Sequence, residues 1–216
     1  MNISFILIIL LSYMVGSISG GVLIGKIRNV DIRKKGSKAA GATNAFRTMG
    51  TLFALSVLII DVYKGYFATY YIPSLFLNET TYLTKSLAGF SAIIGHVYPL
   101  YFKFKGGKGV GTALGTLFAF PQFHFPAAIG FLSWCINLLI TGFVSLGSII
   151  AGIAVSIVFL FKNTGVFDEL LVLTIYIIFI SIFFVLTHRD NIKRLINGTE
   201  NQFKKIMLIN LFKKND

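Results

Sequence analysis

The stretch that decides the fold runs from Ala127 to Phe161 and reads AAIGFLSWCINLLITGFVSLGSIIAGIAVSIVFLF, with no charged residue. As one α-helix, its roughly 35 residues would rise about 50 Å, whereas the hydrocarbon core of a bilayer is about 30 Å thick. We therefore divide it near Thr141 and Gly142 into two helices, at about 127–140 and 143–161. A chain with such a segment is expected to cross the membrane more than once.

The composition of the whole chain agrees with a membrane protein. Of its 216 residues 55% are hydrophobic and only 13% are charged, and a soluble domain of this size could not bury so much apolar surface. The net charge of +12 fits the positive-inside rule and anionic lipids, so we expect membrane lipids as partners and no nucleic acid. The single cysteine, Cys135, lies in an apolar run and suggests neither a disulfide nor a metal site. We expect no metal and no cofactor.

Five further apolar segments extend the prediction to seven transmembrane helices in an all-α polytopic membrane protein. They lie at about 3–25, 51–72, 83–102, 109–120 and 169–187. No basic residue precedes the first segment, so we interpret it as a helix and not as a cleavable signal. Its small residues, GSISGG at 16–21, would let neighbouring helices pack closely.

The distribution of basic residues supports this count. Seven lysines and arginines lie in residues 26–50, three in the glycine-rich loop that follows the third helix, and seven after Thr187; the other three are Lys64, Lys85 and Lys162. Seven helices put the three basic segments on one side of the membrane. The positive-inside rule then predicts an external N-terminus and a cytoplasmic C-terminus.

The segment 95–112, GHVYPLYFKFKGGKGVGT, combines positive charge with glycine. Three lysines surround three glycines: Lys103, Lys105, Lys108, Gly106, Gly107 and Gly109. Because glycine reaches positive φ without strain, such a loop can turn its backbone N–H groups toward an anion, most often a phosphate. The loop is not a Walker A motif, since Gly109 follows the lysine. An ordinary basic cytoplasmic loop has the same residue types, and this alternative stays open.

Two other basic segments carry anion-binding groups. Residues 36–47, GSKAAGATNAFR, offer hydroxyls, an amide and Arg47, although a flexible basic linker would read similarly. Residues 188–203, HRDNIKRLINGTENQF, place His188 and Asn191 on one helix face, whereas a juxtamembrane basic cluster often serves only orientation and lipid contact. Because all three segments are predicted to face the cytoplasm, one composite anion site is favoured.

The second predicted helix carries two ionisable residues, Asp61 and Lys64, near its middle. Three positions apart, they share a helix face and can pair, which limits the cost of placing them in the membrane. Structural pairing is the simpler interpretation. A functional role is the alternative, because ionisable residues inside a membrane often mark a site.

The motifs GSKAAGATNAFR, GHVYPLYFKFKGGKGVGT and HRDNIKRLINGTE, in this order, resemble the three signature motifs of the bacterial acyl-phosphate:glycerol-3-phosphate acyltransferases. DVYKG at 61–65 and FVSLGSI at 143–149 also resemble that family. The resemblance implies one integral-membrane acyltransferase domain over residues 1–216, with cytoplasmic motif segments 26–50, 95–112 and 188–203. It implies a monomeric multi-pass enzyme of the bacterial inner membrane, with its active site at the cytoplasmic face.

The implied reaction moves a fatty acyl group from acyl phosphate to the 1-hydroxyl of glycerol 3-phosphate, giving lysophosphatidic acid and phosphate, the first step of phospholipid synthesis. Acyl phosphate is already activated, so positioning and charge stabilisation suffice. The expected catalytic residues are Ser37, Arg47, Lys108, His188 and Asn191. The expected substrate-binding residues are Thr43, Asn44, His96, Lys105, Gly106, Gly107 and Gly109. In this assignment Lys108 and the glycine N–H groups hold a phosphate, Asn44 belongs to a polar rim, and Asn191 orients the acceptor.

One departure from the family pattern is Ala39, which stands with Lys38 where the family usually has Gly-Asn, so that one amide is lost. No histidine of this chain has an aspartate five positions later, which argues against the soluble type of acyltransferase.

Two other classes of protein stay open from the residues alone. An organic-phosphate transporter should show broken helices and polar groups near the midplane, and a lipid-binding scaffold would need only the basic surface.

Overall fold

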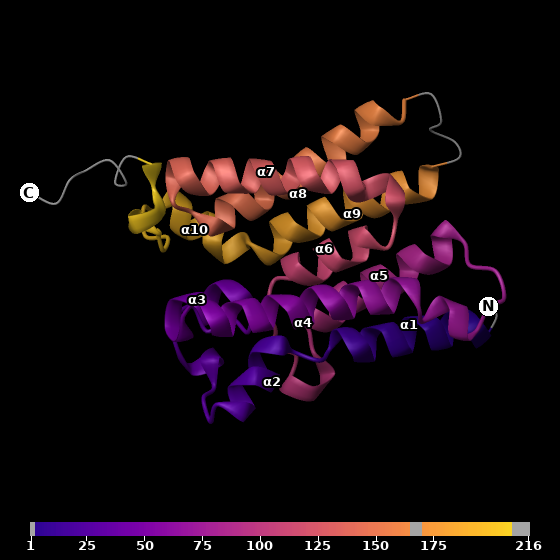
Figure 1. Cartoon of the computed structure of the whole chain (residues 1–216), viewed down its shortest axis with the longest axis horizontal. Coiled ribbons are helices and arrows are strands. Elements are labelled where there is room, and N and C mark those ends of the chain that lie inside the picture. Colours follow the sequence, from indigo (N-terminus) through magenta and orange to yellow (C-terminus); the bar gives the residue numbers. More distant parts are fainter. Residues whose placement is uncertain (1–2, 165–169, 209–216) are drawn as a thin grey trace, which may run out of the picture. The chain divides into compact units, whose positions relative to one another are not determined.

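The structure of this protein, a computed structural model, describes residues 3–164 and 170–208 (Figure 1). In those residues every regular element is an α-helix or a short 3-10 turn, and no strand occurs. The predicted all-α class is thereby confirmed. The chain forms two compact units, Met1–Pro121 and Gln122–Asp216.

Unit 1 contains two closely packed helix pairs. Its helices are α1 (Ile3–Gly16), α2 (Gly20–Ile27), α3 (Ala42–Met49), α4 (Thr51–Tyr70), α5 (Tyr82–Val97) and α6 (Val110–Phe118). Helix α1 packs along α5, and α4 packs along α6. A Cβ atom on Gly16 would collide with the backbone of Ala92, and one on Gly95 with the carbonyl of Tyr13. The small residues therefore bring the backbones together, as the first segment predicted.

The first predicted helix is broken. Helices α1 and α2 meet at an angle of 43° across Ser17–Ser19, so the prediction of one continuous helix over 3–25 was wrong. The Ser17 hydroxyl donates to the carbonyl of Tyr13 at 2.8 Å, and the Ser19 hydroxyl accepts from the N–H of Val22 at 3.4 Å. Serine hydroxyls compete for backbone groups in this way, which ends α1 and caps the start of α2.

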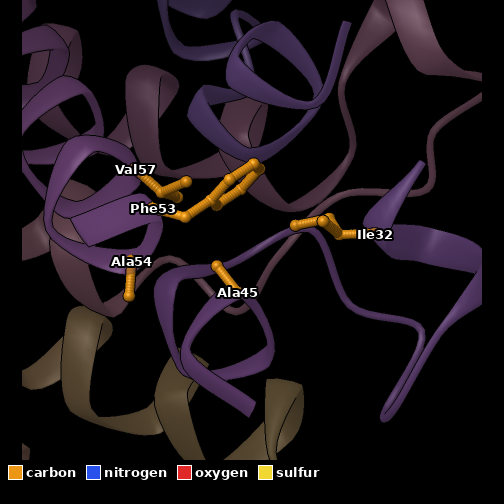
Figure 2. Packing of buried hydrophobic residues seen from close by; sticks show 5 residues of the cluster. All are labelled: Ile32, Ala45, Phe53, Ala54 and Val57. Carbon is orange, nitrogen blue, oxygen red and sulfur yellow. The ribbon is translucent and has the colours of Figure 1, made fainter. Parts of the chain in front are cut away.

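The basic segment 26–50 is folded against α4. Its 3-10 turn η1 (Ile32–Lys34) and helix α3 enclose a small apolar core with α4. Figure 2 shows the side chains of Ile32, Ala45 and Phe53 pointing toward one another. Ile32 and Ala45 are fully buried. The segment is therefore part of the packed unit and not a flexible linker.

Unit 2 consists of α7 (His124–Thr141), α8 (Val144–Lys162), α9 (Leu171–Thr187) and α10 (Arg189–Ile196). Helices α7 and α8 form a hairpin whose turn at Gly142 has φ +70°. That conformation favours glycine, and it confirms the predicted division of the long apolar stretch. The rings of Phe123 and Phe159 pack with centroids 4.5 Å apart.

Three helices of the described residues are long and apolar enough to cross a membrane: Thr51–Tyr70, Pro121–Thr141 and Val144–Lys162. The bent pairs α1 with α2 and α9 with α10 raise this number to five if each pair forms one span. Helices α5 and α6 have 16 and 9 residues, whereas a span normally needs about 20. The count of seven, with its orientation, stays a prediction.

Candidate active site

The glycine-rich loop folds back on the end of α5. The N–H of Gly106 donates to the carbonyl of Val97, and the N–H of Gly107 donates to the carbonyl of His96, each at 3.2 Å. Of the loop's three glycines only Gly109 has a positive φ, +86°, where it caps the start of α6. The expectation that all three N–H groups turn toward one anion was therefore wrong for Gly106 and Gly107.

The positions of Gly106 and Gly107 leave no room for a side chain. A Cβ atom on Gly106 would collide with the carbonyl of His96, and one on Gly107 would collide with Nε2 of the same histidine. The left-handed turn of the loop falls instead on Lys103 and Phe104, with φ of 55° and 58°. The loop is thus held close to α5, and its lysines are presented from a fixed backbone.

The loop also meets the first basic segment. The N–H of Ala40 donates to the carbonyl of Gly106 at 3.4 Å. The predicted polar residues of these two segments reach the surface: Ser37 and Lys105 are exposed, and Thr43, Arg47 and Lys108 are partly exposed. Two of the three motif segments therefore meet within unit 1.

Asn44 has a structural role that its sequence position did not reveal. It is 1% exposed. Its Oδ1 accepts from the N–H of Ser37 at 2.9 Å, and its Nδ2 donates to carbonyls of the same loop, those of Ile32, Lys35 and Ala39, at 2.9–3.1 Å. We expected Asn44 at a polar rim facing substrate. Its amide is instead used to shape the loop that carries Ser37.

A buried charged cluster lies behind the glycine loop. Asp61, Lys64 and His96 are 3%, 4% and 5% exposed. Lys64 Nζ lies 2.7 Å from Asp61 Oδ1 and 2.9 Å from His96 Nδ1. The predicted pairing of Asp61 with Lys64 is confirmed, but the sequence did not show that the pair extends to a histidine of another helix.

The same cluster stabilises the break between α1 and α2. Lys64 Nζ donates to the carbonyl of Ile18 at 2.7 Å, and the N–H of Gly20 donates to Asp61 Oδ1 at 3.4 Å. Backbone groups freed by a helix break must find partners when water is excluded. Both charged side chains of α4, Asp61 and Lys64, serve this purpose.

His188 lies at the bend between α9 and α10 in unit 2 and is 2% exposed. Its Nδ1 lies 2.8 Å from the carbonyl oxygen of Phe184. Because a carbonyl oxygen only accepts hydrogen bonds, Nδ1 carries the proton, and the lone pair of the neutral ring is on Nε2. The bend thus fixes both the tautomer and the orientation of this histidine.

A second buried polar cluster, formed around Asn191 and Glu200, lies in unit 2. Glu200 Oε1 accepts from Asn191 Nδ2 at 2.7 Å and from the Ser145 hydroxyl at 3.0 Å. Its Oε2 accepts from Arg194 Nε at 2.7 Å. Burial alone would raise the pKa of Glu200, but these hydrogen bonds from Asn191, Arg194 and Ser145 lower the pKa below its ordinary value.

In this structure the Nδ2 of Asn191 holds Glu200, whereas the role expected for Asn191 in orienting the acceptor stays a prediction. Glu200 and Ser145 lie in quoted motifs, but sequence reasoning gave neither a role. The available signal was Glu200, the second acid of this motif after Asp190, but its partner Ser145 lies 55 positions away.

Comparison with known proteins identifies the family. The family model described as glycerol-3-phosphate acyltransferase matches residues 6–198. Glycerol-3-phosphate acyltransferase 2 of Bacillus anthracis is 39% identical over 199 residues, which cover 91% of this chain and 98% of the relative. Glycerol-3-phosphate acyltransferase of Bacillus subtilis is 40% identical over 199 residues, covering 92% and 97%.

Two solved structures are similar over nearly the whole chain. Both are crystal structures of PlsY (YgiH), an integral membrane glycerol 3-phosphate acyltransferase. The glycerol 3-phosphate form has a TM-score of 0.82 and 35% identity, and the lysophosphatidic acid form has 0.81 and 34%. Each comparison covers 97% of this chain and 100% of the solved chain. From the family match, the relatives and the shared integral-membrane fold, we conclude that this chain belongs to the glycerol-3-phosphate acyltransferase family.

Proposed function

We propose that this protein transfers a fatty acyl group from acyl phosphate to the 1-hydroxyl of glycerol 3-phosphate. The products are lysophosphatidic acid and inorganic phosphate, and the reaction begins phospholipid synthesis. The observation that supports the proposal is the hydrogen bond from the Ala40 N–H to the Gly106 carbonyl, because it joins the segment that carries Ser37 and Arg47 to the glycine loop. Family membership favours this function over a transporter or a lipid-binding scaffold.

The chemistry needs little beyond placement of two anionic substrates. The hydroxyl oxygen of glycerol 3-phosphate attacks the acyl carbonyl carbon, the bond between that carbon and the phosphate oxygen breaks, and the hydroxyl proton leaves with the phosphate. Acyl phosphate is a mixed anhydride with a good leaving group. Orientation of the reactants and stabilisation of the developing negative charge therefore supply the rate, and the enzyme forms no covalent intermediate.

Both substrates carry a phosphate, so the site needs two cationic regions. We assign one phosphate to Lys108, supported by Lys105 and by the start of α6, whose N-terminal N–H groups favour an anion. Gly109 caps that helix. We assign the other region to Arg47 with the hydroxyls of Ser37 and Thr43, on the loop that Asn44 shapes. An arginine binds phosphate through two parallel N–H groups, which also fixes its orientation.

We assign His188, in unit 2, to the acceptor hydroxyl. With its proton fixed on Nδ1 by the Phe184 carbonyl, Nε2 accepts the hydrogen bond of the acceptor hydroxyl and orients its oxygen. Asn191 acts indirectly, since it holds the segment that contains Glu200.

The protein is a multi-pass membrane protein. We place it in the bacterial inner membrane, as a monomer, with the site at the cytoplasmic face, where glycerol 3-phosphate is dissolved. The basic residues of the three motif segments support this orientation. The acyl chain of the donor then lies in the bilayer while its phosphate reaches the basic surface.

A direct assay tests the proposal. Purified protein in detergent is given radiolabelled glycerol 3-phosphate with either acyl phosphate or acyl-CoA, and label is followed into lipid together with released phosphate. We expect transfer from acyl phosphate only, with one phosphate released for each lipid formed. Transfer from acyl-CoA alone would overturn the assigned donor. Absence of transfer from both donors, by protein shown to be folded, would overturn the function.

A further inference from the structure

Lys64 makes as many hydrogen bonds as its ammonium group has protons. Its Nζ lies 2.7 Å from the carbonyl oxygen of Ile18, 2.7 Å from Asp61 Oδ1 and 2.9 Å from His96 Nδ1. A lysine ammonium carries three N–H groups and accepts no hydrogen bond. With three acceptors at these distances, Lys64 donates one proton to each, including the imidazole of His96.

This donation fixes the tautomer of His96. A ring nitrogen that accepts a hydrogen bond has no proton, so the proton of the neutral ring is on Nε2. The opposite tautomer would direct an Nδ1 proton to Asp61, but Nδ1 is 3.4 Å from Asp61 Oδ1 and only 2.9 Å from Lys64. One carboxylate, one ammonium and a neutral imidazole also give the buried cluster no net charge, which avoids the cost of an unpaired buried ion.

The protonated nitrogen is directed at the glycine loop. His96 is only 5% exposed, and a Cβ atom on Gly107 would collide with its Nε2. In residues 3–164 and 170–208, the hydrogen bonds and ion pairs of the His96 side chain are all made through Nδ1. Nε2 makes none of these interactions, so its N–H can serve a ligand at the loop.

We propose that the Asp61–Lys64 pair holds His96 in the Nε2–H tautomer, and that this N–H donates a hydrogen bond to a phosphate oxygen bound at the glycine loop, residues 105–109. His96 is then a donor to the anion and not a general base. Asp61 and Lys64 are positioning residues, because they act on the ligand through His96. The inference rests on the proposed function in one respect: the proposed function decides which phosphate-bearing substrate occupies the loop.

The tautomer is measured by nitrogen-15 NMR of protein labelled at histidine, in detergent, without substrates. The protonated and unprotonated ring nitrogens differ widely in chemical shift, and the variants His124→Gln and His188→Gln assign the three histidines. We expect a proton on Nε2 of His96, and a shift of this signal when inorganic phosphate is added. In Lys64→Met the proton should move to Nδ1, where Asp61 can accept it. A wild-type proton on Nδ1, or no response to phosphate, would overturn the proposal.

Two substitutions at His96 test the same donor in the reaction. A glutamine amide can reach the position of Nε2, whereas the shorter asparagine amide reaches only that of Nδ1. We expect His96→Gln to keep most of kcat/KM and His96→Asn to lower it about 10- to 100-fold, the range for a hydrogen bond to a charged group. The same pair at the exposed His124 is the matched control and should leave kcat/KM unchanged. Equal losses in both His96 variants would contradict a role as donor.

The outcomes also separate this inference from the proposed function. The NMR measurement needs no turnover, so a phosphate-dependent Nε2–H signal in protein that does not use acyl phosphate would remove the proposed reaction and support the anion site. Active wild-type protein with an Nδ1–H tautomer would support the reaction and refute the role of His96.

Discussion

Lys64 Nζ lies 2.7 Å from the carbonyl oxygen of Ile18, so that a side chain of α4 satisfies a backbone group exposed by the break between α1 and α2. A buried charge is thereby used for two purposes, pairing with Asp61 and stabilising an irregular backbone. Helix breaks persist in membranes only where such partners exist. The position of Ser17–Ser19 therefore depends on a residue far along the chain.

The substitution Lys64→Met tests this dependence. It removes the cation and leaves the Asp61 carboxylate buried, so we expect the free energy of unfolding to fall by about 3–5 kcal/mol. Denaturant unfolding in detergent measures the loss. Lys162→Met, the same change at an exposed lysine at the end of α8, is the control and should have little effect. The double variant Asp61→Asn/Lys64→Met should recover part of the stability, and a single variant as stable as the control would refute the assignment.

Gly107→Ala tests whether position 107 has room for a side chain. The added Cβ atom would collide with Nε2 of His96, so we expect a loss of about 1–3 kcal/mol in unfolding free energy and a lower rate of acyl transfer. Gly41→Ala is the matched control for stability, since nothing lies within 4 Å of its added Cβ. Removing the imidazole in His96→Ala/Gly107→Ala should restore part of the lost stability. A double variant no more stable than Gly107→Ala would show that the collision is not the cause.

Glu200 gives a pH dependence of stability. Its pKa is lowered in the folded protein by hydrogen bonds from Asn191, Arg194 and Ser145, against the effect of burial. The stabilisation is therefore complete above the ordinary pKa of an unfolded glutamate, and is lost as the pH falls through the lower folded value. Thermal unfolding from pH 7 to pH 3 should show wild type more stable than Glu200→Gln at neutral pH, with the difference shrinking toward acid pH.

The control for this experiment is Glu79→Gln, the same substitution at an exposed glutamate. It should melt like wild type at neutral pH. A difference between wild type and Glu200→Gln that stays constant over the whole pH range would contradict a stabilising carboxylate, because a structural effect of the side chain's shape does not titrate.

What the sequence predicted depended on local patterns. The turn at Gly142 followed from the length of the apolar stretch, and the pairing of Asp61 with Lys64 followed from their spacing. The helix break was missed because Ser17 and Ser19 are compatible with a helix in an apolar context, and the partner that stabilises the break, Lys64, lies 46 positions from Ile18.

For the candidate site, the sequence indicated which loops carry polar and cationic residues, but not which atoms those side chains contact. The motifs identified the loops, but Asn44 and Asn191 were assigned to substrate because an amide in a basic loop resembles a ligand group. Their buried partners lie within the fold, at Ile32 and Ala39 for one and at Glu200 for the other. The glycines of the loop were expected to serve a backbone with positive φ. At Gly107, glycine is needed instead because a Cβ atom would collide with His96. Such contacts arise only when elements separated in sequence pack together.

Lys108→Gln is the most direct test of the proposed phosphate site. Glutamine keeps much of the length of lysine and can still donate a hydrogen bond, so the variant removes chiefly the positive charge. The charge is expected to stabilise the phosphate most strongly while the bond to the acyl group breaks. We therefore expect kcat/KM for acyl transfer from acyl phosphate to fall by about 100-fold or more, with unfolding unchanged, because Lys108 is partly exposed.

Lys85→Gln is the matched control, since it makes the same change at a lysine of α5 that lies over the ring of Tyr70, 5.1 Å from its centroid. It should keep wild-type activity. Lys108→Arg separates charge from shape, because it restores the cation with a different donor geometry, and we expect it to recover part of kcat/KM. Lys108→Gln that is folded and as active as Lys85→Gln would remove Lys108 from the site and leave Arg47 as the cation to test next.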